Sequence, residues 1–274
     1  MRLDLDLVRR VEHSAAEVGA RQALALATRS PSSGAAAEPC DGGSLLSFGH
    51  GRYVNRAVGL GLGGTDAAEI IAALDRFYDS RSMPPSVEIS PWATEDLLGE
   101  LASADYRLER FRNVYVRALA SLPEEPEVSI VRIDAGSTLR HHILAGDTEP
   151  GSEARRISDE YCDAAGFVDG AVDLVALVDA EPAACGSLNM IDGVGWLGGA
   201  ATLSAHRGRG LQSALVARRL RLATEHGCTF AAATALPDGQ SARNLERLGF
   251  RLAYTQAVLT RRGSRAGASA SGCY

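Results

Sequence analysis

The residues whose types and spacing point most clearly to chemistry lie at positions 207–212, where the chain reads Arg-Gly-Arg-Gly-Leu-Gln. A strand-like apolar run precedes them, and from Leu211 apolar residues recur at helical spacing. A strand that turns sharply into a helix leaves the first N–H groups of that helix without partners. Glycines let the backbone approach a ligand, and arginines add positive charge. The segment therefore predicts a cradle for a pyrophosphate group, with backbone donors from Arg209 to Ser213.

This turn resembles the acyl-CoA-binding motif of the GNAT superfamily of N-acyltransferases, which reads Arg/Gln-x-x-Gly-x-Gly/Ala. Residues 207–210 match the motif, whereas Gln212 replaces its final Gly or Ala and is expected to narrow the pocket without removing the backbone donors. The resemblance continues through a strand-like run at 228–234 and a short helix that ends in Leu-Gly-Phe at 248–250. It covers residues 127–262 and implies acetyl-CoA as the acyl donor. We expect no metal, because the cysteines are scattered and form no Cys-x-x-Cys pair.

The resemblance also assigns roles to residues near the cradle. The strand from Ala201 to Leu203 would pair with the pantetheine amides of CoA, and the N–H of Leu203 would polarise the thioester carbonyl. Many GNAT enzymes carry a tyrosine acid where this chain has Leu245, so Tyr254 is the candidate that protonates the CoA thiolate, with packing in a strand as the alternative. The expected CoA-binding residues are Ala201, Leu203, Arg207, Gly208, Arg209, Gly210, Leu211, Gln212, Ser213 and Asn244.

A general base is harder to assign from the sequence. No carboxylate lies within 194–203, where the family often supplies one. The open candidates are Glu181, Asp192, His206, His141 and His142, and we assign none of them. Cys185 is interpreted as a small buried hydrophobic residue rather than a nucleophile. Direct attack by an amine held next to the thioester needs no covalent enzyme intermediate.

Composition excludes several classes of protein. The net charge of −6 does not provide the basic surface that nucleic-acid binding needs. No apolar run reaches the length of about 18 residues that a membrane span requires. Acidic residues near the N-terminus argue against a signal peptide, and the five cysteines are scattered and without metal-ligand spacing. We expect a cytoplasmic protein that acts on a small-molecule amine, and we predict no particular oligomeric state.

The order of predicted elements divides the chain into two lobes. In the first lobe, residues 1–120, we expect helices at 5–26, 65–79 and 94–104, strands at 52–62, 86–90 and 107–119, and a loop at 30–44. Residues 121–127 read as a linker, 128–262 as the second lobe and 263–274 as a disordered tail. Tyr-Arg-Leu at 106–108 and Phe-Arg-Leu at 250–252 recur at an offset of 144 residues. This repeat favours an α/β (α+β) fold with two GNAT-like lobes, each a mixed, mostly antiparallel sheet flanked by helices.

Two alternatives compete with an acetyltransferase acting on a primary amine of a small molecule. The first is a non-catalytic acyl-CoA-binding or scaffold protein, because the family tyrosine and an evident base are missing. The second is dinucleotide binding, because Gly59, Gly61 and Gly64 formally match a Gly-x-Gly-x-x-Gly fingerprint. These glycines fall in the first-lobe segment that corresponds to the predicted cradle, which has no arginine. The first lobe is therefore expected to lack the cradle and to shape a cleft between the lobes.

Overall fold

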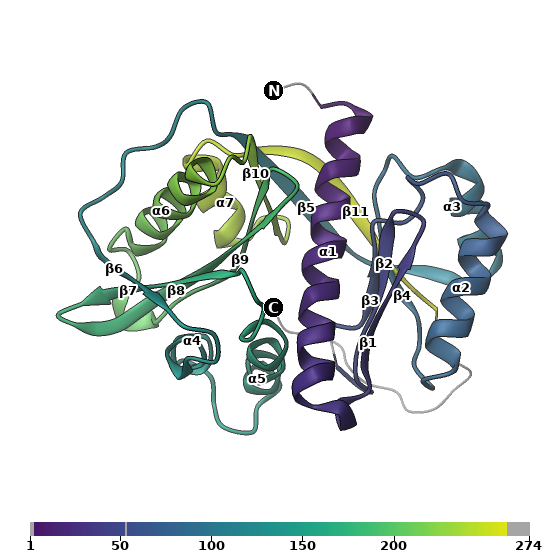
Figure 1. Ribbon diagram of the computed structural model, residues 1–274, viewed down its shortest axis with the longest axis horizontal. Helices are drawn as coiled ribbons and strands as arrows, with labels where there is room; N and C mark the ends of the chain where they lie inside the picture. The colour runs from purple at the N-terminus through teal and green to yellow at the C-terminus, as the bar shows by residue number, and fades with distance from the viewer. Residues whose placement is uncertain (1–2, 53, 262–274) are drawn as a thin grey trace.

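The computed structural model describes residues 3–52 and 54–261, and the predicted disordered tail from Gly263 lies outside these ranges. The described strands form one eleven-stranded mixed sheet with the order β1-β2-β3-β4-β11-β5-β10-β9-β8-β7-β6 (Figure 1). The strands are β1 (Ala35–Cys40), β2 (Gly43–Phe48), β3 (Arg56–Val58), β4 (Ser86–Ile89), β5 (Tyr106–Ala118), β6 (Ser129–Ile133), β7 (Val172–Val178), β8 (Glu181–Ile191), β9 (Val194–Thr202), β10 (Phe230–Ala235) and β11 (Arg251–Arg261). The helices are α1 (Leu5–Arg29), α2 (Ala67–Asp79), α3 (Glu95–Ser103), α4 (Thr138–Ala145), α5 (Glu153–Ala165), α6 (Leu211–Glu225) and α7 (Gln240–Arg247).

Both lobes follow the same order of elements, as the sequence repeat predicts. The first lobe runs β3–α2–β4–α3–β5 and the second runs β9–α6–β10–α7–β11. In each lobe the first two of these strands are parallel neighbours. The expected fold class, two GNAT-like lobes of mixed sheet flanked by helices, is confirmed.

The two lobes exchange their last strands. β5, from the first lobe, pairs antiparallel with β10 of the second lobe. β11, the last strand of the second lobe, pairs antiparallel with β4 of the first lobe and with β5. The sheet is therefore continuous across the lobe boundary, and the boundary in sequence at 121–127 is not a boundary in the sheet.

The expected loop at 30–44 is wrong, because β1 and β2 form an antiparallel hairpin there. Its turn is Asp41-Gly42, and both residues have positive φ. Alanines at 35–37 carry little local strand signal, and the hairpin forms because β1 and β2 pack against α1. The expected strand at 52–62 contracts to β3, because Gly59 and Gly61 adopt positive φ and turn the chain into a loop.

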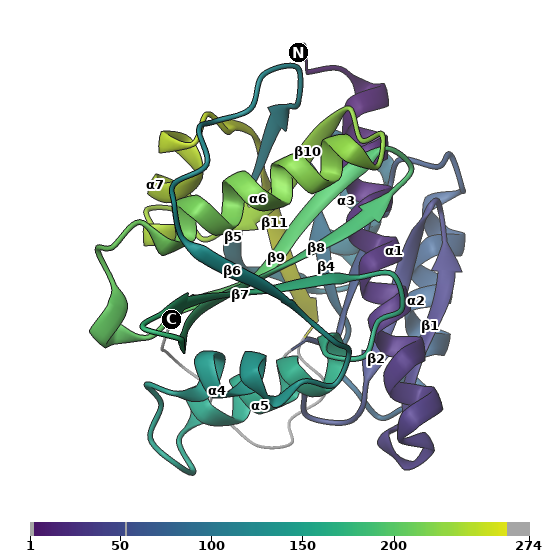
Figure 2. The ribbon, with the colours of Figure 1, turned by 60° about the vertical axis from the view of Figure 1, so that its left-hand side comes forward.

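Helices cover both faces of the sheet. On the second lobe, Leu215 and Leu220 of α6 pack against Leu174 of β7, whereas Ile143 of α4 packs against Val175 on the opposite face. Figure 2 shows α4 and α5 on one side of β6–β9 and α6 on the other. Helix α1 crosses the middle of the molecule in Figure 1 and packs on both lobes. Of the helices in the described residues, none is long and apolar enough to cross a bilayer.

Candidate functional site

The predicted cradle forms an exposed turn between β9 and α6. A short 3-10 turn, Ser204–His206, leads into it, and residues 207–210 are exposed. Gly208 and Gly210 both have φ of +76°, a conformation that side chains with a Cβ rarely adopt. A Cβ built on either glycine would meet no atom within 4 Å. No protein atom therefore crowds the backbone at these two glycines.

The start of α6 presents a row of unpaired backbone donors. No side chain caps the helix, and the first helical bond at this end runs from the Ala214 N–H to the Gly210 carbonyl. Among the described residues, no protein group accepts a hydrogen bond from the N–H groups of residues 208–213. Together with the positive end of the helix dipole, these amides make a favourable environment for an anion.

Strand β9 separates from β10 just before the cradle. The parallel pairing of the two strands ends at Leu197 opposite Ala233, although β9 continues to Thr202. On β8, Cys185 pairs with Ala201 and Ser187 pairs with Gly198. Strand β9 therefore has one residue more than β8 between these two pairs. This β-bulge contains Gly199 at φ +56° and bends β9 away from its neighbour. The gap between the two strands leads from the sheet toward the cradle.

The N–H of Leu203 is not free to polarise a thioester, contrary to expectation. It donates to the Ala183 carbonyl on β8 at 3.0 Å. Alternate residues of a strand direct their N–H groups to opposite edges, so the amide that points away from β8 belongs to Thr202. The sequence could not reveal this, because one bulge changes which residues face the gap.

The side chain of Gln212 turns inward from the cradle. Its Nε2 donates to the carbonyls of Ala201 at 2.7 Å and Cys185 at 3.1 Å, and to Thr202 Oγ1 at 3.1 Å. The side chain therefore ties the first turn of α6 to the end of β9 instead of extending over the exposed amides. It also occupies the Ala201 carbonyl, one of the groups expected to pair with pantetheine.

The two arginines of the turn differ in their surroundings. Arg207 donates to Asp147 Oδ2 at 3.2 Å and to the Thr202 carbonyl at 3.3 Å. Asp147 also accepts from the backbone N–H and the hydroxyl of Ser204. Arg209 forms no hydrogen bond or ion pair with another described residue. Arg209 is thus the free cation of the turn, and Asp147 is a neighbour that the sequence did not identify.

Residues 140–250 match the sequence model of the acetyltransferase (GNAT) family. This part of the chain is therefore similar to a GNAT acetyltransferase domain. A GCN5-related N-acetyltransferase from Kribbella flavida is similar in structure, with a TM-score of 0.63 and 21% identity over 91% of this chain and 96% of that one. A tandem GNAT protein from the clavulanic acid biosynthesis pathway has a TM-score of 0.53 and 15% identity over 78% of this chain and 72% of that one. No curated protein sequence matches the chain.

Tyr254 does not lie at the cradle of the GNAT domain. Its hydroxyl is buried and donates to Glu12 Oε1 on α1 at 2.7 Å. The ring packs with Val8 and Phe230 on the face of the sheet opposite α6. Tyr254 is therefore not placed to protonate a thiolate. Its position agrees with the alternative interpretation, an aromatic residue that packs in a strand. Asn244, on α7, bonds Gln240 and Arg247, and its contact with CoA stays a prediction.

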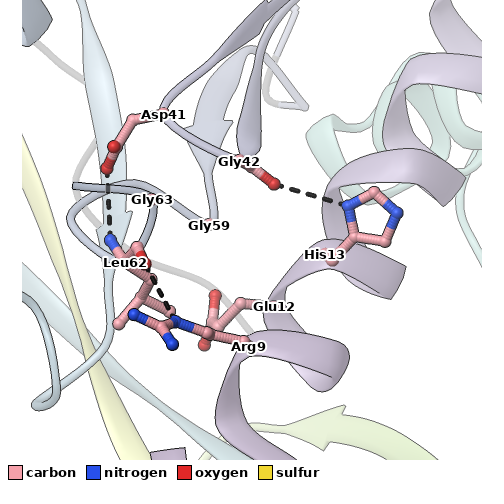
Figure 3. Close-up of a pocket in the computed structure, with 8 residues that line it drawn as sticks. All are labelled: Arg9, Glu12, His13, Asp41, Gly42, Gly59, Leu62 and Gly63. Atoms are coloured by element: carbon pink, nitrogen blue, oxygen red, sulfur yellow. Dashed lines mark hydrogen bonds between the residues drawn. The ribbon is translucent and has the colours of Figure 1, made fainter. Parts of the chain in front are cut away.

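In the first lobe, the segment that corresponds to the GNAT cradle already holds an anion. Asp41, in the β1–β2 turn, accepts from the N–H groups of Gly61 at 2.6 Å, Leu62 at 3.1 Å and Thr65 at 2.8 Å. Figure 3 shows the Asp41 carboxylate directed at this loop. The dinucleotide interpretation needs these amides for a phosphate, so the protein's own carboxylate argues against it.

A cavity of about 360 Å³ lies beside this loop, between it and α1 (Figure 3). Glu12 is 1% exposed and accepts from Tyr254 and from Gln256 Nε2, and no arginine within residues 3–52 and 54–261 bonds to it. Burial raises the pKa of Glu12 from 4.5 to about 7. The residues that line the cavity are Arg9, Glu12, His13, Asp41, Gly42, Gly59, Leu62 and Gly63.

A second cavity, of about 820 Å³, lies against α4 and the β7–β8 turn. It gathers three of the candidate bases, Glu181, His141 and His142. Its wall includes Gly146, where an added Cβ would lie 2.5 Å from the Leu203 side chain. This cavity therefore borders the end of β9. His141 Nε2 bonds Asp159, and this bond holds the pKa of the Asp159 carboxyl below its usual value.

The remaining candidate bases are placed differently. Asp192 lies at the turn between β8 and β9, at the opposite end of β9 from the cradle, where it pairs with His13. His206 precedes the cradle, and its buried Nδ1 has no hydrogen-bond partner among the described residues. Within those residues, no three His, Cys, Asp or Glu side chains cluster as metal ligands would.

Proposed function

We propose that this protein is an acetyl-CoA-dependent N-acetyltransferase that transfers an acetyl group to a primary amine of a small molecule. The observation that carries the proposal is the row of unpaired N–H groups at residues 208–213, on an open turn at the start of α6. A pyrophosphate is an anion of the right kind for such a row. The match of residues 140–250 to the GNAT acetyltransferase model supports acetyl-CoA as its source.

The 820 Å³ cavity supports a small acceptor. Its volume falls in the range of small-molecule sites, roughly 300–1,000 Å³. Glu181 and the two histidines at its wall are groups that can accept a proton from an ammonium or through water. The neutral amine then attacks the thioester directly, held by both sites, and CoA leaves without an enzyme-bound acetyl group.

Binding of CoA is tested by titration calorimetry with three arginine variants. R209A removes the free cation of the turn and should weaken CoA binding by about 10-fold to 100-fold, the equivalent of 1.5–3 kcal/mol for a charge-assisted bond. R207A should have a smaller effect, because Arg207 already pairs with Asp147. R132A, an exposed position on the edge strand β6, is the control. Equal CoA affinity in wild type and R209A would refute the cradle assignment.

Catalysis is tested by release of the CoA thiol from acetyl-CoA over a panel of small primary amines. We expect thiol release to require an amine. In R209A, the rate of thiol release should fall by a factor similar to the loss of CoA affinity. Tight CoA binding without release for any amine would favour the alternative, a non-catalytic acyl-CoA-binding protein. That alternative is motivated by Leu245 at the position of the family tyrosine.

A further inference from the structure

Two hydroxyl groups meet at the bulge of β9. Tyr161 reaches it from α5, and Ser187 lies on the neighbouring strand β8. A Cβ built on Gly199 would lie 2.7 Å from Ser187 Oγ and 2.9 Å from the Tyr161 hydroxyl oxygen. Both oxygens therefore lie close to the Gly199 backbone, where a residue with a Cβ would not fit. Neither side chain was singled out from the sequence, because α5 and β8 are far from the cradle along the chain.

Ser187 is left without a hydrogen bond at this place. The residue is 4% exposed, and its Oγ has no partner among the described residues. A buried hydroxyl that bonds to nothing costs about 1–3 kcal/mol, so such groups call for an explanation. The Tyr161 hydroxyl, in a half-buried residue, also forms no hydrogen bond with a described residue. The two groups are thus free to bond to a ligand.

The bulge lies where the reacting end of an acyl-CoA would reach. Four residues separate Leu203, beside the cradle, from Gly199, which corresponds to about 13 Å at 3.3 Å per strand residue. Gly199 comes two residues after Leu197, the last residue of β9 that pairs with β10. Helix α5, which carries Tyr161, lies on the face of the sheet opposite α6, the helix that follows the cradle (Figure 2). Ser187 shares the α5 face, because it lies two residues after Cys185 on β8, and Cys185 packs with Ile143 of α4. A donor laid along the gap would present its thioester to them.

The charge at the bulge favours an anion. Arg219, on α6, is 1% exposed and donates to the carbonyls of Ser187 at 3.1 Å and Gly198 at 3.3 Å. It forms no ion pair with a described carboxylate. An added Cβ on Gly186 would lie 2.7 Å from its guanidinium carbon, which places the cation directly at the bulge. Burial also raises the pKa of Tyr161, so its phenol stays protonated and able to donate.

We propose that Tyr161 and Ser187 form a two-hydroxyl site for the thioester, in which Tyr161 protonates the departing CoA thiolate and Ser187 bonds the carbonyl oxygen. This assignment rests on the acetyltransferase function proposed above. The amine nitrogen forms a bond to the carbonyl carbon, and negative charge moves to the oxygen that Ser187 binds. The C–S bond then breaks, sulfur takes the Tyr161 proton, and the phenolate recovers a proton from the attacking nitrogen through water.

The test compares Y161F and S187A with wild type in CoA binding, kcat and KM. Y161F should lower kcat by about 100-fold or more, the effect of losing a general acid. S187A should lower kcat by about 10-fold or more, in line with loss of one oxyanion donor. In both variants CoA affinity should stay within about two-fold of wild type, because neither residue touches the cradle. S187A should retain the fold, because Ser187 Oγ bonds no residue in the part of the chain that the structure describes.

The control is Y78F, which removes a buried hydroxyl from the first lobe, where Tyr78 donates to the Leu46 carbonyl. It should keep wild-type kcat. Wild-type kcat in Y161F and S187A, with normal thiol release by wild type, would overturn the two-hydroxyl site alone. Absence of CoA binding by wild type would overturn the proposed function and this site together.

Discussion

Glu12 makes the stability of this protein depend on pH in a direction that can be worked out. The carboxyl is buried between α1 and β11, where Tyr254 and Gln256 donate to it. Burial disfavours its charged form most, and the nearby Glu88 adds a smaller effect of the same sign. The pKa of Glu12 rises from 4.5 to about 7. The folded state therefore holds this proton over a pH range in which the unfolded chain has released it.

The sign and size follow from proton linkage. Between pH 4.5 and about 7 the folded protein binds more protons at Glu12 than the unfolded chain does. The free energy of unfolding therefore falls as pH rises through this window and levels off above it. The change from 4.5 to about 7 corresponds to about 3 kcal/mol, taking about 1.4 kcal/mol per pKa unit. Glu12→Gln is neutral at every pH and lacks this contribution.

The measurement is urea unfolding of wild type and E12Q at pH 4.5 and pH 8. Any new hydrogen-bond geometry in E12Q changes the free energy of unfolding by the same amount at both pH values. The comparison therefore uses only how the difference in this free energy between E12Q and wild type changes from pH 4.5 to pH 8. The stability of E12Q relative to wild type should increase by about 3 kcal/mol between pH 4.5 and pH 8. E17Q, which removes a 36% exposed carboxylate from the same helix, is the control and should follow wild type. Parallel pH curves for wild type and E12Q would refute the reasoning.

Two further substitutions test contacts that define the lobes. Asp41→Ala leaves the N–H groups of Gly61, Leu62 and Thr65 without the carboxylate that accepts from them. The free energy of unfolding, measured by urea denaturation, should therefore drop by about 2–4 kcal/mol. A drop below about 0.5 kcal/mol would mean that water fully replaces the carboxylate. Asp173→Ala leaves Arg140 buried without its ion-pair partner and should cost about 3–5 kcal/mol in thermal or urea unfolding, which unchanged stability would contradict.

The sequence predicted features that depend on neighbours along the chain. The cradle was identified because its glycines, its arginines and the following apolar helix lie within one short segment. The repeat at an offset of 144 residues identified two similar lobes. It could not reveal the strand exchange, because the repeat only marks the starts of β5 and β11 as equivalent and does not say which lobe each strand joins. The sequence also does not identify Asp147, which follows α4, or Tyr161, which lies on α5. Only tertiary packing brings these two segments close to β9.

Register was the other property that the sequence could not supply. A shift of one residue in register decides whether a given N–H of β9 faces β8 or the gap between β9 and β10. The bulge at Gly199 introduces such a shift. Leu203 was expected to face the gap and instead bonds Ala183. The glycine pair at 198–199 is the signal that could have indicated a bulge.

The strand exchange has a consequence for how the lobes fold. In the described structure β11 pairs only with β4 and β5, both from the first lobe, and β10 receives β5 on one edge. A fragment that begins at residue 128 would lose both partners of β11 and would expose one edge of β10. It would also lose the contacts of Tyr254 and Gln256 with Glu12 on α1. We therefore expect the lobes to be one folding unit, with residues 121–127 a linker in sequence only.

This expectation can be tested with two fragments, 1–127 and 128–274. Each alone should lack a cooperative thermal transition, because each is missing a strand from the interior of its sheet. Mixed in equal amounts, they should associate and regain the transition and CoA binding, since all sheet pairings can then form. The competing outcome is that β11 moves to β10 and takes the place of β5, which would complete a single lobe. A 128–274 fragment that melts cooperatively and binds CoA alone would show that the second lobe is an independent domain.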